Sequence, residues 1–294
     1  MTLSTPVLPC PGRRPPAPGP FRMLAVDLDG TLIGTDLVLR PAVRQAIRAL
    51  LEAGVRVVLA TGRMYCSARP FAQALGLRDP LICYQGALIR EVTGAERVLR
   101  ERPVPLALAR AITRFAQAHD LTLHLYFDDR AYTARATPNS AYYAALNRIA
   151  VEEVGDLLPL LRRRPTKLVI ISGPEGAAAI AAALAERWGQ QAQVVLSHPR
   201  FAEVTARGVA KGSALRWLAG RLGIPRSQIV AIGDQQNDCS LLAAAGYAVA
   251  VGNAAPELKA MAHLIAPPVS EDGVAWAVRQ LFRGVGGMPS GESQ

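Results

Sequence analysis

The sequence predicts an α/β fold, in which a doubly wound parallel sheet forms a core and an α+β domain is inserted into it. Two observations predict this fold. Short apolar runs alternate with helical patterns in residues 22–86 and again in residues 200–283, and several runs end in polar residues or glycine. The intervening block, residues 87–199, carries strands and helices of its own. The chain of 294 residues is long enough for one large or two medium domains.

The first part of the core has the order strand, helix, strand, helix, strand, which implies parallel strands joined by right-handed connections. An apolar run ends at Asp27, and a short polar flap follows it. Pro41 suits the first turn of a helix with an apolar stripe, and Gly54 ends that helix. The remaining elements expected here are a strand at 55–60, a helix at 65–75 and a strand at 81–84.

The inserted block opens with a predicted β-hairpin over residues 87–101, with its turn at Thr93 and Gly94. After the hairpin, helical and apolar stretches continue without the regular alternation of the core. We expect helices near 104–118, 138–148 and 175–188, and strands near 121–127, 167–172 and 192–197. We therefore place the limits of the inserted domain at residues 87 and 199.

The doubly wound pattern resumes near Phe201. Lys211 falls in the first turn of a helix over 210–222, and a strand over 228–232 ends at Gly233 and Asp234. We then expect a helix at 237–245, a strand at 247–251, a helix at 256–262, a strand at 264–265 and a helix at 273–282. Outside the core we expect a proline-rich disordered leader over 1–21, or a later start of translation, and a flexible tail over 284–294.

The composition narrows the classes of function. The formal net charge is +10 with a pI of about 10.0, which suits anionic metabolites and would equally admit nucleic acid. Arginine is spread along the chain and no basic cluster is interleaved with aromatic residues, so we expect no nucleic-acid partner. The four cysteines lack metal-site spacing, which predicts reduced thiols in a cytoplasmic protein. We expect no membrane span and no secretory signal.

Asp27 and Asp29 follow the first strand, at the kind of strand end where ligands collect in open α/β sheets. The two side chains would point the same way if the extended conformation continued to Asp29. Crowded carboxylates are costly unless a cation, a shared proton or phosphate chemistry justifies them. The alternative is a polar turn that merely closes the strand, because Asp and Gly are common in turns.

Polar residues at other strand and helix ends argue against a simple turn. Thr61 follows the second strand, Lys211 opens a later helix, and Asp234 follows another strand, with Asn237 and Asp238 close behind. A hydroxyl, an ammonium group and several carboxylates at one sheet edge suit phosphoryl transfer. Mg²⁺ prefers oxygen ligands, and positive charge neutralises a phosphoryl group. The sequence therefore predicts a site for magnesium-dependent phosphoryl transfer.

The ordered motifs resemble the haloacid dehalogenase (HAD) superfamily of phosphatases. They are most similar to its Cof-type, class IIB sugar-phosphatase branch, in which a large α/β cap is inserted after the third strand. The similarity covers about 22–282. The chain departs from the pattern of this branch at two positions. At the position of Gln85, near the core–cap junction, relatives usually carry Asn, and at the position of Leu241 they often carry Met. The matching motifs are Asp27-Leu28-Asp29-Gly30-Thr31-Leu32, Ala60-Thr61-Gly62-Arg63, Val209-Ala210-Lys211-Gly212-Ser213-Ala214-Leu215 and Gly233-Asp234-Gln235-Gln236-Asn237-Asp238.

The resemblance implies a role for each motif residue. Asp27 would be the nucleophile that forms an aspartyl-phosphate. Asp29 would be the general acid for the leaving alcohol and then the base for the attacking water. The implied phosphate ligands are Leu28, Thr61, Gly62, Lys211 and Asn237. The implied metal-site residues are Asp27, Asp29 through its backbone carbonyl, Asp234, and Asp238, which would hold the water shell of the metal or Lys211.

The implied activity is Mg²⁺-dependent hydrolysis of small phosphorylated metabolites, such as sugar phosphates, FMN or pyridoxal phosphate. The cap would select the leaving group of the ester. Two alternatives stay open: a phosphomutase of the same superfamily, and a non-catalytic regulator that binds a phosphorylated ligand. The sequence indicates neither the physiological ester nor the oligomeric state.

Structural alternatives stand beside these roles. Lys211 is also compatible with a solvated helix face, and Thr61 and the Asn237–Asp238 pair with helix caps. We expect Arg63 to be structural or to face the cap. In the cap, we expect His124 and His198 to pack or lie at the surface. The cap tyrosines suit a pocket and core packing equally well; they are Tyr126, Tyr132, Tyr142 and Tyr143.

Overall fold

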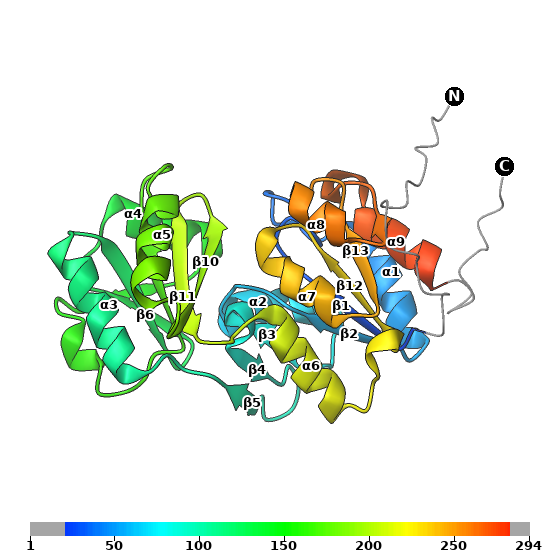
Figure 1. Ribbon diagram of the computed structural model, residues 1–294. Helices are drawn as coiled ribbons and strands as arrows, with labels where there is room; N and C mark the ends of the chain where they lie inside the picture. Colours follow the sequence, from blue (N-terminus) through cyan, green and yellow to red (C-terminus); the bar gives the residue numbers. More distant parts are fainter. Residues whose placement is uncertain (1–20, 283–294) are drawn as a thin grey trace.

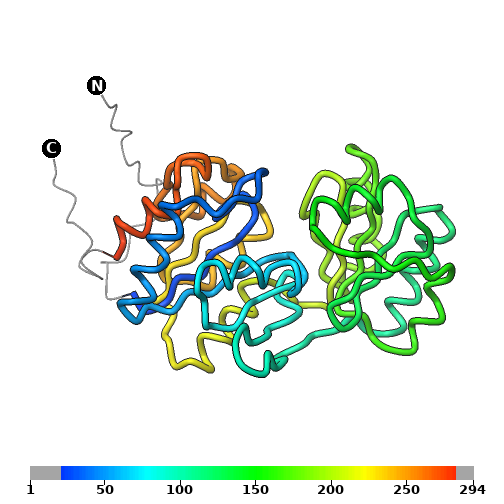
Figure 2. The backbone as a smooth tube through the Cα atoms, turned by 180° about the vertical axis from the view of Figure 1, so that it is seen from behind, coloured from blue at the N-terminus to red at the C-terminus, as the bar shows by residue number. Residues whose placement is uncertain are grey.

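The computed structural model describes residues 21–282, which form two lobes (Figure 1). Two chain segments join the lobes (Figure 2). One runs from β5 (Val98–Glu101) to α3 (Leu106–Ala118), and the other from β11 (Phe201–Ala206) to α6 (Lys211–Arg221). We call the lobe that contains both ends of the described chain the core, and the other lobe the cap.

The expected leader and tail lie outside the described residues, apart from Phe21 at the end of the leader. Phe21 is buried, and the centre of its ring lies 5.7 Å from those of Tyr247 and Phe282. Its assignment to a disordered leader is therefore wrong, because its ring fills a gap between two elements of the core. Within residues 21–282, no helix combines the length and the apolar character needed to cross a membrane.

The core is built on a five-stranded parallel sheet, which confirms the predicted fold class. Its order is β14-β13-β12-β1-β2, so the chain leaves β1 and later β12 in opposite directions across the sheet. Right-handed connections then place helices on both faces. The strands are β1 (Met23–Val26), β2 (Arg56–Leu59), β12 (Ile229–Gly233), β13 (Tyr247–Ala250) and β14 (Leu264–Ile265).

Helices cover both faces of this sheet (Figure 1). On one face α1 (Pro41–Glu52) packs against α9 (Gly273–Leu281), and on the other α6 packs against α7 (Cys239–Ala244). α1 begins at Pro41 as predicted, and its apolar stripe is buried. The other core helices are α2 (Tyr65–Ala74) and α8 (Pro256–Met261), with short 3₁₀ turns at η1 (Tyr84–Gly86), η3 (Arg226–Gln228), η4 (Gln236–Asp238) and η5 (Val269–Glu271).

The third predicted strand, β3 (Leu81–Cys83), does not join the main sheet as expected. It pairs antiparallel with β4 (Leu88–Arg90), which pairs with β5, and only an isolated bridge at Ala60 and Ile82 ties it to the main sheet. The predicted hairpin is present, but Leu88 and Ile89 are buried in the core cluster. The predicted start of the inserted domain at residue 87 is therefore too early, because the hairpin belongs to the core.

The cap contains a six-stranded sheet of order β10-β11-β9-β6-β7-β8 with its own apolar cluster. β11 pairs antiparallel with β9 and β10, so the cap extends to Ala206 and the predicted limit at 199 is too early. An apolar strand such as β11 suits either sheet, and only its pairing partners decide. The other cap elements are β6 (Thr122–Phe127), β7 (Arg130–Thr133), α4 (Pro138–Asn147), β8 (Val151–Glu153), η2 (Leu158–Leu160), β9 (Lys167–Ile171), α5 (Ala177–Trp188) and β10 (Ala192–His198).

Candidate active site

Asp27 lies at the carboxyl end of β1 and is 4% exposed. Its amide donates to the Ile232 carbonyl at 3.0 Å, which extends the pairing of β1 with β12 by one residue. The chain then turns at Gly30, which has a φ of +76°. A Cβ at Gly30 would lie 2.1 Å from Asp234 Oδ2, so this close approach of two motifs requires glycine. Because Asp27 is buried where two motifs meet, the alternative of a polar turn that merely closes the strand does not account for it.

Lys211 begins α6 and joins the first, third and fourth motifs. Its Nζ lies 2.6 Å from Asp27 Oδ1 and 2.7 Å from Asp238 Oδ1, and its side chain is 1% exposed. Burial by itself would lower the pKa of Lys211, but the carboxylates of Asp238 and Asp27 outweigh burial and raise that pKa. The ammonium group is therefore held in its charged form against Asp27. The alternative of a solvated helix residue is wrong.

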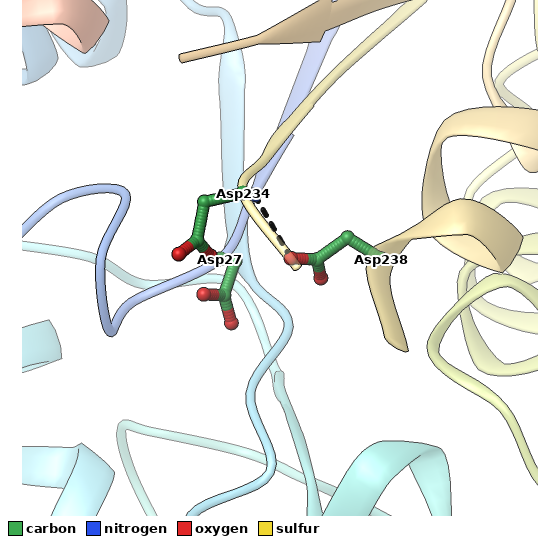
Figure 3. Close-up of side chains that lie close together, drawn as sticks. All are labelled: Asp27, Asp234 and Asp238. Carbon is green, nitrogen blue, oxygen red and sulfur yellow. Dashed lines mark hydrogen bonds between the residues drawn. The ribbon is translucent and has the colours of Figure 1, made fainter. Parts of the chain in front are cut away.

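Three buried carboxylates gather beside Lys211, from Asp27, Asp234 and Asp238 (Figure 3). One oxygen from each lies within 4.8 Å of the others. Burial raises the pKa of Asp27 well above its usual value; Lys211 opposes that rise, while the neighbouring carboxylates add to it. Burial and Asp238 raise the pKa of Asp234 to about 6. The cluster thus holds negative charge that Lys211 alone does not neutralise, and this donor set fits a hard divalent cation.

Asp238 differs from the other two because its carboxylate accepts from Lys211 and also from two backbone amides. Oδ1 accepts from Lys211, and Oδ2 accepts from the backbone amides of Asp234 at 3.1 Å and Gln235 at 3.2 Å. The carboxylate therefore closes the turn before α7 and orients Lys211. Of the two roles implied for Asp238, the structure therefore shows the contact with Lys211. Asp238 also accepts from backbone amides in the turn before α7, as the structural alternative of a helix cap requires.

Thr61, Gly62 and Asn237 lie around Asp27 on two further loops. The Thr61 hydroxyl accepts from the Arg63 amide at 3.1 Å. Met64, and not Thr61, is the residue that precedes α2, so the alternative in which Thr61 caps this helix is wrong. Asn237 donates through Nδ2 to Gln85 Oε1 at 3.1 Å. A Cβ at Gly62 would lie 2.4 Å from Gln85 Nε2, so a larger residue there would displace the Gln85 side chain.

Arg63 holds the second acid of the first motif. Its Nε and Nη2 donate to the two oxygens of Asp29 at 2.7 and 2.6 Å, and Nη1 donates to Ser67 Oγ at 3.1 Å. The Arg63 side chain is 5% exposed, whereas that of Asp29 is 47% exposed. A bidentate pair of this kind fixes the direction of a carboxylate. Arg63 therefore has the structural role expected for it and also touches the site.

A cavity of about 390 Å³ opens between core and cap in front of these residues. Its core wall includes most of the predicted site residues: Asp27, Asp29, Thr61, Gly62, Asp234 and Asn237. Lys211 and Asp238 are buried and do not line this cavity, and Lys211 reaches it through Asp27. The Leu28 side chain is fully buried in the core, so any contact of Leu28 with phosphate would be made by its backbone.

Residues 24–278 match the family of haloacid dehalogenase-like hydrolases. The chain belongs to this family. The HMP-PP phosphatase of Serratia proteamaculans is 30% identical to it over 245 residues, which cover 82% of this chain and 87% of that one. The 5-amino-6-(5-phospho-D-ribitylamino)uracil phosphatase YitU of Bacillus subtilis is 27% identical over 268 residues, covering 88% and 97%.

The fold of this HAD hydrolase is shared with a crystal structure of a haloacid dehalogenase-like hydrolase from Bacteroides thetaiotaomicron. The two chains are 28% identical with a TM-score of 0.81, and the match covers 89% of this chain and all of the other. The predicted superfamily and the predicted enzyme class, a phosphatase, are confirmed by these comparisons.

The cap wall of the cavity in this HAD hydrolase includes three aromatic side chains, those of Tyr143, His198 and Phe201. The Phe201 ring lies 4.4 Å from that of His198 in a stacked arrangement and 4.7 Å from that of Tyr143. Of the cap tyrosines, Tyr143 lines the cavity, as His198 also does, whereas Tyr126 is fully buried and Tyr132 packs against the cap cluster. His124 is buried and pairs with Ser140 Oγ at 2.8 Å, so its expected packing role is correct.

Sequence reasoning missed Lys167 and Glu203. They form a buried ion pair in the cap, with Nζ 3.2 Å from Oε2, and Glu203 lines the cavity. The available signal was a single charged residue in each of two otherwise uncharged strands, Lys167-Leu-Val-Ile-Ile and Phe201-Ala-Glu-Val-Thr-Ala. Such residues are rarely buried unless they are paired.

Proposed function

We propose that this HAD phosphatase hydrolyses phosphate monoesters of small metabolites in a Mg²⁺-dependent reaction through an aspartyl-phosphate. One observation carries the proposal. The Asp27 carboxylate faces the cavity while it is held from behind by Lys211 at 2.6 Å and flanked by the buried carboxylate of Asp234. A nucleophile, a fixed positive charge and a divalent-cation donor set therefore meet at one point of the cavity wall.

In the proposed reaction, an oxygen of Asp27 attacks phosphorus and the bond from phosphorus to the leaving oxygen breaks. Asp29 gives its proton to that oxygen, so the alcohol leaves neutral. Water then attacks the aspartyl-phosphate, Asp29 takes a proton from it, and the P–O bond to Asp27 breaks to release phosphate. Both oxygens of Asp29 contact Arg63 in this structure, so one of these two contacts has to open when Asp29 carries the proton, while the other keeps the carboxyl group in place.

The remaining residues would bind the phosphate group and the metal ion. The Thr61 hydroxyl, the Gly62 amide, the Leu28 amide and the Asn237 side chain are the proposed phosphate ligands, and Lys211 neutralises Asp27 and the phosphoryl group. Asp27, Asp234 and the Asp29 carbonyl would hold Mg²⁺, with Asp238 behind them. When bound, the cation would neutralise charge on the phosphoryl oxygens.

The cavity and the relatives support a small leaving group with one ring. A volume of about 390 Å³ lies in the lower range of small-molecule pockets, and the cap wall offers the rings of Tyr143, His198 and Phe201. The name of one relative specifies HMP-PP, and that of the other specifies a phosphorylated ribitylamino-uracil. We propose single-ring phosphates, either sugar phosphates or heteroaromatic esters such as pyridoxal phosphate, ahead of the larger FMN.

We also propose a cytoplasmic location and no nucleic-acid partner. Cys66, Cys83 and Cys239 are free thiols, which suits a reducing compartment. The positive net charge of +10 suits an anionic metabolite as the partner.

The test is a screen of the purified protein against sugar phosphates, pyridoxal phosphate, FMN and nucleotides, with inorganic phosphate release as the readout. We expect turnover with Mg²⁺, loss of turnover with EDTA, and recovery when Mg²⁺ is restored. Full turnover after complete chelation would contradict the metal requirement. An isomeric phosphate ester in place of free phosphate would identify a phosphomutase, and tight ligand binding without any turnover would identify a regulator.

A further inference from the structure

The cap carries one buried ion pair that faces the core. Lys167 begins β9 and Glu203 lies within the neighbouring strand β11, and their side chains are 1% and 5% exposed. The Lys167 Nζ also lies 5.6 Å from the Tyr84 ring centre and 5.1 Å from that of Tyr126. These rings lie against the Lys167 ammonium group, and the low exposure of both side chains strengthens their interactions with the polar groups that they contact.

Each member of the pair reaches across to a different loop of the core. Lys167 Nζ donates to the Gly62 carbonyl at 3.1 Å. Glu203 Oε2 accepts from Gln85 Nε2 at 3.3 Å, and Gln85 Oε1 in turn accepts from Asn237 Nδ2 at 3.1 Å. The cap pair is therefore connected to Gly62 and Asn237, which are both proposed phosphate ligands on separate loops.

Gln85 is held in an unusual backbone conformation at this junction. Its φ of +58° follows a φ of +53° at Tyr84, and both residues are buried. Left-handed non-glycine residues of this kind cost about 1–3 kcal/mol each, and they persist where surrounding contacts determine them. The Gln85 amide donates to the Thr61 carbonyl at 3.1 Å, so this residue is also tied to the second motif. The Gln85 side chain spans from Asn237 to Glu203.

Stability alone gives no reason for a charged pair at this place. Burying two charges is costly, and apolar replacements of similar volume are often neutral or stabilising. Polar side chains are needed, however, for the contacts with Gly62 and Gln85, because no apolar side chain can donate or accept there. This points to a role in the geometry of the adjacent phosphate site.

We propose that Lys167 and Glu203 are positioning residues of the phosphate site, which set the spacing of the loops that carry Gly62 and Asn237 when the cap is seated on the core. The phosphate site is then complete only while the cap makes these contacts. This proposal rests on the proposed function, because it takes Gly62 and Asn237 as phosphate ligands. Neither Lys167 nor Glu203 takes part in the chemistry.

The decisive variant is the full-length double substitution Lys167→Met and Glu203→Leu, which removes both charges and leaves neither one unpaired. Its matched control is Arg130→Met with Glu152→Leu, which removes a cap ion pair between β7 and β8. For each protein we would measure the melting temperature, kcat, KM, and the dissociation constant of inorganic phosphate in the presence of Mg²⁺. The single variant Glu203→Gln serves as a conservative replacement.

We expect the Lys167/Glu203 double variant to keep a melting temperature close to that of the wild type, and to bind phosphate roughly ten- to a hundredfold more weakly with a parallel loss in kcat/KM, because misplacements of about 1 Å can cost a hundredfold in rate. The Glu203→Gln variant should lose less, since an amide oxygen can still accept from Gln85. The control should match the wild type.

Wild-type phosphate affinity and kcat/KM in a folded Lys167/Glu203 double variant would overturn the proposal. If the double variant fails to fold, the single variant Lys167→Met decides instead, because it removes the donor to the Gly62 carbonyl while Glu203 keeps its contacts with Gln85 and Ser197. Wild-type phosphate affinity in that variant would overturn the proposal. A wild-type protein that binds phosphate but hydrolyses no ester would contradict the proposed function alone, and the phosphate affinities would still test the pair. A wild-type protein that binds no phosphate would overturn both.

Discussion

The guanidinium of Arg63 contacts both carboxylate oxygens of Asp29, with Nε 2.7 Å from Oδ2 and Nη2 2.6 Å from Oδ1. Asp29 is the half-exposed member of the Asp27–Asp29 pair, and Arg63 is almost completely buried. The two acids that follow β1 are thus held by different cations, Asp27 by Lys211 and Asp29 by Arg63. Their separate partners match the separate roles proposed for them.

Replacing Arg63 by Lys should lower kcat by about tenfold or more with a smaller change in KM, because a lysine cannot reproduce the bidentate contact with Asp29. Steady-state kinetics with the best ester of the screen measures this. The matched control is Arg56→Lys, which alters the Arg56–Asp79 pair at the opposite end of β2. Wild-type kcat in the Arg63→Lys variant would show that this pair is only structural.

The Asp27→Asn variant should lose turnover below the detection limit and keep its fold, because the amide is not a nucleophile while its shape and burial are unchanged. Phosphate release and the circular dichroism melting curve together check this expectation. Removing a carboxylate from the crowded cluster relieves repulsion but leaves Lys211 with Asp238 as its remaining partner. Full activity of this variant would exclude Asp27 as the nucleophile.

Asp129 should hold the cap against the core. It lies in the turn between β6 and β7, and its carboxylate accepts from the Tyr65 amide at 2.9 Å, the Cys66 amide at 2.7 Å and the Tyr84 hydroxyl at 2.8 Å. Each hydrogen bond to a charged group contributes about 1.5–3 kcal/mol. The variant Asp129→Gly should therefore expose the start of α2 to faster hydrogen exchange and reduce kcat/KM.

The neighbouring residue supplies the matched control for this prediction. Asp128 and Asp129 have φ values of +48° and +61°, so glycine relieves similar backbone strain at either position. Asp128 pairs only with the cap residue Arg163 among the contacts found for its side chain in residues 21–282. Equal effects of Asp128→Gly and Asp129→Gly on hydrogen exchange at α2 would refute the assigned role of Asp129.

His124 should make the cap less stable in mild acid. Burial, assisted by the positive charge of Lys167, lowers the pKa of His124 to about 3. An unfolded histidine has a pKa of about 6.5, so below that pH the unfolded chain takes up a proton that the folded chain does not, and stability falls as the pH decreases. From pH 7 to pH 5 this linkage amounts to about 2 kcal/mol.

Denaturant unfolding at pH 7 and pH 5 checks this expectation. The variant His124→Gln stays neutral at both pH values and retains a polar group near Ser140, so it should lose about 2 kcal/mol less between them than the wild type. An identical loss in the two proteins would show that the acid sensitivity arises from other groups.

Much of the site could be predicted because its residues lie in short segments around the ends of predicted elements. The residues that follow β1 and β12 are brought together by any parallel sheet in which these two strands are neighbours. Local patterns were therefore sufficient to predict Asp27, Thr61, Lys211 and Asp234. The resemblance of four ordered motifs then supplied the family.

What the sequence could not predict depends on partners that are distant along the chain. Strand pairing decides whether a segment such as β11, or the hairpin of β4 and β5, belongs to the core or to the cap. The residue pattern of such a segment would be the same in either lobe, so the sequence could not decide. The Lys167–Glu203 pair joins residues 36 positions apart through a contact between strands.

The sequence by itself determined the fold class and the phosphatase class, and it predicted the acids at the strand ends, because periodicity and motifs act over a few residues. Only the tertiary structure decided that Arg63 holds Asp29 and that Asp238 accepts from Lys211. It also decided how the cap contacts the core: Lys167 contacts Gly62, and Glu203 is connected to Asn237 through Gln85. The physical reason is that a buried charge must find an opposite charge or a hydrogen-bond partner, and folding alone determines which one is within reach.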